Sequence, residues 1–155
     1  MTPNRLLVVY AGILSLVAAS LHAGVIREHY AEWWGYGLFF IVAATGQGVY
    51  GLVLMAVPAK PSWSGPTWDR WLRVLYWCGI LGNAAIVGLY VVTRTVGVPW
   101  LGPEAGTVEQ VAQIDLVSKG VEIGLMTCLG TLLATMTPSH AGSEDGWSAA
   151  HPRSH

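Results

Sequence analysis

The sequence predicts an all-α fold, a four-helix transmembrane bundle with short loops and with both termini in the cytoplasm. Of its 155 residues, 53% are hydrophobic and only 11% are charged, whereas a soluble domain usually carries about 25% charged residues. Four apolar runs are long enough to cross a hydrocarbon core of roughly 30 Å, which takes about 20 helical residues. The runs lack the alternating pattern of a membrane β-barrel, and helices satisfy their own backbone groups in lipid.

The predicted spans cover residues 6–26, 34–57, 71–93 and 111–136. The first also resembles a signal peptide, because an early arginine precedes an apolar run with small residues at Ala18 and Ser20. However, the run continues past Ser20 and is long enough to span, so we interpret it as a membrane helix. Residues 1–137 then form one transmembrane domain, and the polar tail at 138–155 has too little apolar surface to fold, so we expect it to be disordered.

Basic residues predict the orientation, since cytoplasmic loops collect lysine and arginine. One side of the predicted bundle carries Arg5, Lys60, Arg70, Arg73 and Arg153. The other side carries Arg27 and Arg94. This asymmetry favours a multi-pass protein of the plasma membrane, with its first and third loops outside. Trp33, Trp34 and Tyr36, at the start of the second span, are typical of an aromatic anchor at the interface.

Composition and motifs exclude several classes of function. The net charge is −1, so the chain lacks the basic footprint of a nucleic-acid-binding protein. Cys78 and Cys128 lie inside apolar runs without the spacing of a zinc or redox motif, and we predict that both are small core residues. The sequence contains no HExxH motif, Ser/His/Asp order or phosphate-binding loop, so catalysis has little support.

Helical spacing predicts which side chains face the interior of the bundle. Small residues let membrane helices approach closely, and Gly12 and Ser15 share a stripe with His22 on the first span. The larger polar residues on the inward stripes of the first three spans are His22, Gln47, Asn83, Tyr90 and Arg94. We therefore expect a column of polar side chains inside the bundle.

The fourth span carries the strongest signal, because Asp115, Lys119 and Glu122 follow one another within two helical turns. A charged residue near the bilayer centre costs about 2.5–3.5 kcal/mol on the insertion scale, so these residues must pair, reach water or have a function. Lys119 is placed to meet either acid. Two acids and one lysine leave one negative charge unbalanced, and Arg94 can neutralise it. We expect an ion pair of Asp115 with Lys119, and a titrating or metal-binding role for Glu122.

The segment LHAGVIREHYAEWWGYG joins the first two spans and contains two histidines. His29 and Glu32 have a spacing that lets two ligands converge on a helix, and His22 lies one heptad earlier. With Asp115 or Glu122 they predict a site for a transition metal ion such as zinc, copper or iron. The alternative is that His22 hydrogen-bonds an acid of the fourth span while His29 faces water. A haem is disfavoured, because His22 is the one histidine well inside a span.

Two segments of the chain, HAGVIREHYAEWWGYGLFF and RTVGVPWLGPEAGTVEQVAQIDLVSKGVEI, together resemble a group of small four-span membrane proteins of high-GC bacteria. The resemblance covers most of the chain apart from the tail. It implies a four-span fold and supplies no catalytic or binding residues.

These observations favour a small non-enzymatic membrane protein whose outward-facing polar site binds a metal ion or a small cation. Two alternatives stay open. In one, the chain is an accessory subunit of a larger membrane complex, and its charged stripe pairs with another protein. In the other, a homo-oligomer carries protons or ions; acids and histidines suit such a path, whereas four short spans without an internal repeat do not resemble a full transporter.

Overall fold

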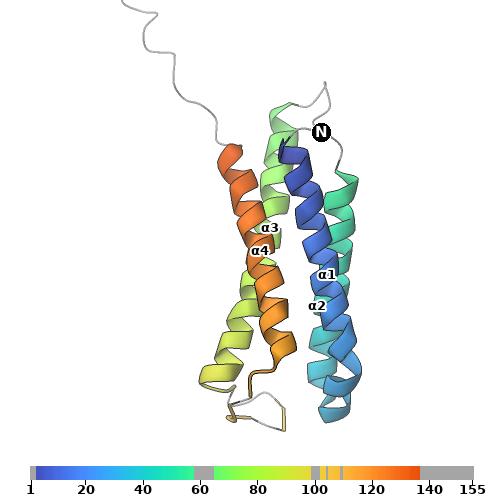
Figure 1. The fold of residues 1–155 in the computed structure, drawn as a ribbon, viewed down its shortest axis with the longest axis vertical. Coiled ribbons are helices and arrows are strands. Elements are labelled where there is room, and N and C mark those ends of the chain that lie inside the picture. The colour runs from blue at the N-terminus through green and yellow to red at the C-terminus, as the bar shows by residue number, and fades with distance from the viewer. Residues whose placement is uncertain (1–2, 58–64, 99–101, 104, 109, 137–155) are drawn as a thin grey trace, which may run out of the picture.

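The computed structural model describes residues 3–57, 65–98, 102–103, 105–108 and 110–136. Four helices follow one another in the chain: α1 (Pro3–Glu32), α2 (Trp34–Ala56), α3 (Pro66–Thr95) and α4 (Gln113–Thr135). They run alternately up and down as one elongated bundle (Figure 1). All four are long and apolar enough to cross a membrane, so the predicted all-helical fold with four spanning-length helices is confirmed. The predicted tail at 138–155 lies outside the described residues.

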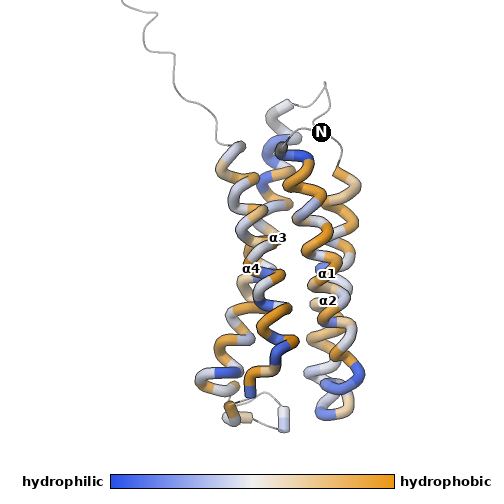
Figure 2. Tube along the Cα trace, in the orientation of Figure 1, coloured by the Kyte–Doolittle hydropathy of each residue, from blue (hydrophilic) through white to orange (hydrophobic). Residues whose placement is uncertain are grey.

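The outer faces of the helices are apolar, as expected of surfaces that meet lipid. Figure 2 shows hydrophobic positions along the length of each helix, with hydrophilic positions gathered near the two ends and along one part of α4. Val42 on α2 and Leu81 on α3 are each 63% exposed. Because an exposed side chain of this kind is disfavoured in water, these faces support membrane insertion of the bundle.

The helix α1 is longer than the sequence predicted. It continues to Glu32, and Trp33 alone separates it from α2. Trp33 has an extended backbone, with φ −162°, and its N–H donates to the His29 carbonyl at 3.0 Å. Gly37 permits this abrupt reversal, because a Cβ atom there would lie 2.7 Å from the Cα atom of Tyr30. The predicted loop between the first two spans is therefore a helical extension with a one-residue turn.

Small residues hold α1 and α2 close together. A Cβ atom on Gly51 would lie 2.9 Å from the carbonyl oxygen of Gly12, so only glycine fits this contact without a shift. One turn away, the Ser15 hydroxyl donates to the Gln47 carbonyl at 2.7 Å. Close approach through small residues is a common way for membrane helices to associate, and it makes α1 and α2 a tight pair.

We call the end of the bundle that holds the start of α1 the N-terminal end, and the opposite end, where α1 meets α2, the turn end. The apolar core lies toward the N-terminal end and comprises Val8, Ala11, Leu54, Leu72, Tyr76, Leu125, Cys128, Leu129 and Leu132. Cys128 is thus a core residue, as predicted. The same prediction for Cys78 is wrong, because its side chain is exposed; it lies on the outer face of α3.

The two helix pairs separate toward the turn end. Close backbone packing joins α1 to α2, α1 to α4 and α3 to α4, whereas α2 and α3 hardly approach each other. Figure 1 shows α3 leaning away from α2 toward the turn end. The apolar core therefore gives way to a wider space between the pairs, and this space holds the polar residues.

Candidate functional site

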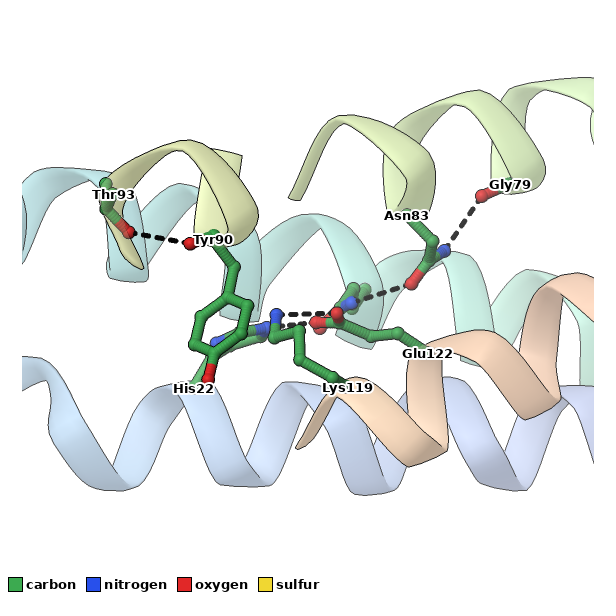
Figure 3. A network of polar contacts seen from close by, with 8 residues as sticks. His22, Gly79, Asn83, Tyr90, Thr93, Lys119 and Glu122 are labelled. Carbon is green, nitrogen blue, oxygen red and sulfur yellow. Dashed lines mark hydrogen bonds and ion pairs between the residues drawn. The ribbon is translucent and has the colours of Figure 1, made fainter. Parts of the chain in front are cut away.

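Glu122 lies at the centre of a buried polar cluster formed with His22 and Lys119, which we call the Glu122 cluster. Its side chain is 0% exposed. One carboxylate oxygen, Oε1, lies 2.8 Å from Nε2 of His22, and the other, Oε2, accepts a hydrogen bond from Nζ of Lys119 at 2.6 Å. Figure 3 shows these side chains converging from α1 and α4. The sequence alternative in which His22 hydrogen-bonds an acid of the fourth span is thereby confirmed.

The local sequence explains why this cluster forms. Lys119 and Glu122 are three residues apart on α4 and share one helix face. His22 lies on the stripe of α1 that packs against the bundle and is only 4% exposed. A buried carboxylate is tolerated when it is paired and its oxygens accept hydrogen bonds. Glu122 meets both conditions, and it ties α1 to α4 between the apolar core and the turn end.

A second ion pair joins α3 to the start of α4. Nη2 of Arg94 donates to Oδ2 of Asp115 at 2.9 Å, and the same carboxylate oxygen accepts the backbone N–H of Ala112 at 3.2 Å. A negative charge in the first turn of a helix is favourable because the unpaired N–H groups there carry partial positive charge. The predicted neutralisation by Arg94 is therefore present.

The expected ion pair of Asp115 with Lys119 is replaced by these two pairs. Lys119 takes Glu122 as its partner, and Asp115 takes Arg94. Between the two pairs stands the ring of Tyr90, with the Arg94 guanidinium 5.1 Å from its centroid and the Lys119 ammonium 5.4 Å from it. Both cations thus contact the electron-rich face of one aromatic ring.

An amide pair links α2 to α3 next to the Glu122 cluster. Nε2 of Gln47 donates to Oδ1 of Asn83 at 3.0 Å, and Nδ2 of Asn83 donates to the Gly79 carbonyl at 2.8 Å. Both amides are buried. Because the backbones of these two helices hardly approach each other, this pair is a principal direct connection between them, together with the Tyr50 hydroxyl that donates to the Leu75 carbonyl at 3.1 Å.

A cavity of about 610 Å³ opens between the helix pairs toward the turn end. All four helices contribute to its lining. Apolar and aromatic side chains form most of the wall, and polar side chains lie mainly on α1, α3 and α4. The lining includes Leu21, His22, Val25, His29, Trp33, Trp34, Tyr36, Phe39, Phe40, Ile86, Leu89, Tyr90, Thr93, Arg94, Asp115, Ser118 and Lys119.

The residues predicted as metal ligands do not gather into a common group. His29 donates from Nδ1 to the Val25 carbonyl at 3.0 Å, and its ring lies 4.3 Å from that of Phe40, centroid to centroid. Glu32 is exposed at the last position of α1. Among the described residues, no three histidine, cysteine or acidic side chains form a group that could hold a metal ion. His22 and His29 instead share the Phe40 ring as a neighbour.

Sequence reasoning missed the cavity and the role of the aromatic residues in it. Trp33, Trp34 and Tyr36 were expected to be interface anchors, and the structure places all three in the cavity lining. The rings of Trp33 and Tyr36 meet edge to face at 5.0 Å, and Gly102 of the connection between α3 and α4 packs against both. The sequence did hold a signal for a shared site, because these three aromatic residues closely follow His22 and His29, and all five line the cavity.

Comparisons with models of protein families, with curated proteins and with solved structures gave no match. The cavity and the two ion pairs beside it are therefore the features from which a function can be inferred.

Proposed function

We propose that this chain is a multi-pass protein of the plasma membrane that binds a small lipophilic molecule in the cavity between its helix pairs. The observation that carries this proposal is the cavity itself, which measures about 610 Å³. Sites for small organic ligands are clefts of about 300–1,000 Å³, lined mainly by apolar and aromatic groups with a few polar groups that orient the ligand. This cavity has the expected size and the expected kind of wall.

The same geometry weighs against a cation as the resident ligand. Both oxygens of Glu122 already accept hydrogen bonds from His22 and Lys119. Asp115, the acid named in the cavity lining, is engaged by Arg94. A metal ion or small cation would have to displace a lysine or an arginine from these acids, and it would meet their positive charges in doing so.

Elemental analysis of the detergent-purified protein, with a visible spectrum of the same sample, tests the metal hypothesis directly. If a metal ion is the ligand, zinc, copper or iron will be present in near-stoichiometric amount. The variant that carries both His22→Ala and His29→Ala will then lack this metal. On our proposal, the protein carries no stoichiometric metal even after these ions are supplied during growth.

Two other hypotheses from the sequence, an accessory subunit and an ion carrier, find less support in the described residues. An accessory subunit was expected to pair its α4 charges with another chain, but these charges pair within their own chain. An ion carrier needs a path across the bundle, whereas the cavity lies toward the turn end and the apolar core occupies the N-terminal end. With both termini in the cytoplasm, as we propose from the basic residues, the cavity lies in the outer half of the membrane.

Photolabelling tests the proposed binding. The probe is a long-chain fatty acid methyl ester with a diazirine at the end of its tail, added to the protein in lipid nanodiscs, and the labelled peptides are mapped by mass spectrometry. We expect saturable labelling of the segments that line the cavity, in α1, α2 and α3.

A pair of matched substitutions serves as test and control. Val25 lines the cavity, so Val25→Trp should fill it and reduce cavity labelling at least severalfold. Val42 lies on the outer face of α2, so Val42→Trp makes the same change in size and should leave labelling unchanged. If Val25→Trp does not fold, Leu89→Trp fills the cavity from α3. Labelling that does not saturate, or that stays the same in the filled variant, would refute the proposal.

A further inference from the structure

The polar end of the cavity offers hydrogen-bond donors, while the carboxylates of Glu122 and Asp115 beside it are already paired. We infer that the ligand is an uncharged amphipathic molecule whose head group is a hydrogen-bond acceptor of the carbonyl type. This inference rests on the proposed function and deepens it. Three observations support it: two buried hydroxyl groups that have no partner in the described part of the chain, the donors of one ammonium group, and the balance of charge around the cavity.

Two hydroxyl groups in the cavity lining, those of Tyr90 and Ser118, are buried and find no hydrogen-bond partner among the described residues. Ser118 is only 6% exposed, and it projects from α4 one residue before Lys119. Figure 3 shows the Tyr90 side chain extending from α3 toward His22 and Lys119. A buried polar group that lacks a partner is costly, so a ligand whose head group hydrogen-bonds to either hydroxyl is favoured. A hydroxyl can donate or accept, so the Lys119 ammonium beside them decides which kind of head group fits.

The Lys119 ammonium adds to the donors. It carries three N–H groups, and one of them is used by Glu122 in the contact at 2.6 Å. The carboxylate oxygens of Glu122 are occupied, because His22 and Lys119 engage one each. A head group that brings a carbonyl oxygen would therefore meet the Lys119 ammonium as well as the two hydroxyls, while a head group that brings only donors could reach the hydroxyls but not the ammonium.

Charge balance indicates that this head group is uncharged. Lys119 and Glu122 neutralise each other, and so do Arg94 and Asp115. Within a membrane each additional charge is expensive, and neither an anionic nor a cationic head has an unpaired counter-charge in these two pairs. The aromatic wall at Phe40, which faces the ring of His22 at 5.6 Å, suits the apolar part of the ligand.

Competition against the photolabel, with four probes that share a ten-carbon chain, tests this inference. Decane has no head group, methyl decanoate has a neutral acceptor, decanoate has an anion, and decyltrimethylammonium has a cation. Concentrations are referred to the amount of each probe in the nanodisc lipid, so that partitioning does not decide the order. We expect methyl decanoate to compete best, about three- to tenfold better than decane for each hydrogen bond it gains.

Variants locate the preference in the cavity. Tyr90→Phe and Ser118→Ala keep both ion pairs and remove one hydroxyl each, and together they should reduce the advantage of methyl decanoate over decane at least threefold, with the Lys119 ammonium left to supply what remains. Ser20→Ala is the matched control, because the Ser20 hydroxyl is exposed and donates to its own helix at the Leu16 carbonyl. It should leave the order of the four probes unchanged.

The possible outcomes distinguish a wrong head group from a failure of cavity binding itself. Equal competition by decane and methyl decanoate would overturn the acceptor head group while leaving cavity binding intact. Stronger competition by decanoate or by decyltrimethylammonium would overturn the uncharged head group in the same way. If the four probes keep the same order of competition, with the same ratios, in the Tyr90→Phe, Ser118→Ala double variant, the two hydroxyls do not recognise the head group and that part of the inference is overturned. If nothing competes and labelling does not saturate, the binding function itself is refuted.

Discussion

The substitution Glu122→Gln tests whether the Glu122 cluster is ionised, as the charge argument above requires. Glutamine keeps the shape of the side chain and removes its negative charge. If the cluster were neutral, the loss would be limited to two hydrogen bonds, which average about 0.6 kcal/mol each in membrane proteins. If it is ionised, the change leaves the Lys119 ammonium without its counter-charge, and removing one partner of a buried ion pair costs about 3–5 kcal/mol.

The structure places the expected value near the lower end of that range. Glu122 is fully buried, but the Lys119 side chain is 12% exposed and borders the cavity, where water or ligand lowers the cost of a lone ammonium. We therefore expect Glu122→Gln to reduce the free energy of unfolding by about 3 kcal/mol. The assay is unfolding in mixed micelles by titration with dodecyl sulfate, followed by tryptophan fluorescence.

Two further variants complete the experiment. Adding Lys119→Met to Glu122→Gln removes both charges, and it should recover about 2 kcal/mol of the loss because a stranded charge is what costs most. Asp115→Asn is the control, since its pair with Arg94 is more exposed, at 24% and 13%, and should contribute no more than about 1 kcal/mol. A loss near 1 kcal/mol for Glu122→Gln, with no recovery in the double variant, would refute the reasoning.

Three other predictions follow from the packing and the orientation. Gly51→Ala should cost about 1–3 kcal/mol through overpacking against α1, whereas Gly46→Ala, where a Cβ atom meets nothing within 4 Å, should be neutral or stabilising; thermal unfolding in detergent compares them. Asn83→Leu should lower the free energy of unfolding by about 0.6–1.7 kcal/mol, because the buried Gln47 amide then lacks its acceptor. Adding Gln47→Leu should recover stability in the same unfolding assay. In a background without the native cysteines, a membrane-impermeant maleimide should label Glu28→Cys in intact cells and Arg70→Cys only after lysis; the opposite pattern would reverse the proposed orientation.

The number and order of the helices could be predicted because length and hydropathy are local properties of the sequence. The end of α1 could not, for a physical reason. The segment from Arg27 to Glu32 is polar, and hydropathy reports where a chain leaves the lipid, not where its backbone stops being helical. The helix continues because nothing in that segment breaks it, and it ends where Trp33 adopts an extended backbone.

The cavity was beyond prediction because it depends on how far two helix pairs diverge. Each aromatic residue at the turn end is compatible with an interfacial anchor and with a cavity wall, and the second environment exists only because α2 and α3 lie apart. The same holds for Cys78, whose apolar surroundings in sequence suited a core residue but whose face of α3 points outward.

The partners of Lys119 show how the tertiary structure decides the chemistry of the site. The sequence placed an acid on either side of it at helical spacing, and a pairing with Asp115 would have left Glu122 with one oxygen free for a cation. In the structure Arg94 takes Asp115, so Lys119 turns to Glu122, and His22 occupies the remaining oxygen. The negative charges that favoured a metal site in the sequence are thereby paired within the bundle. What is left facing the cavity is the Lys119 ammonium, two hydroxyls and aromatic rings, which is why we propose an uncharged acceptor and not a metal ion as the ligand.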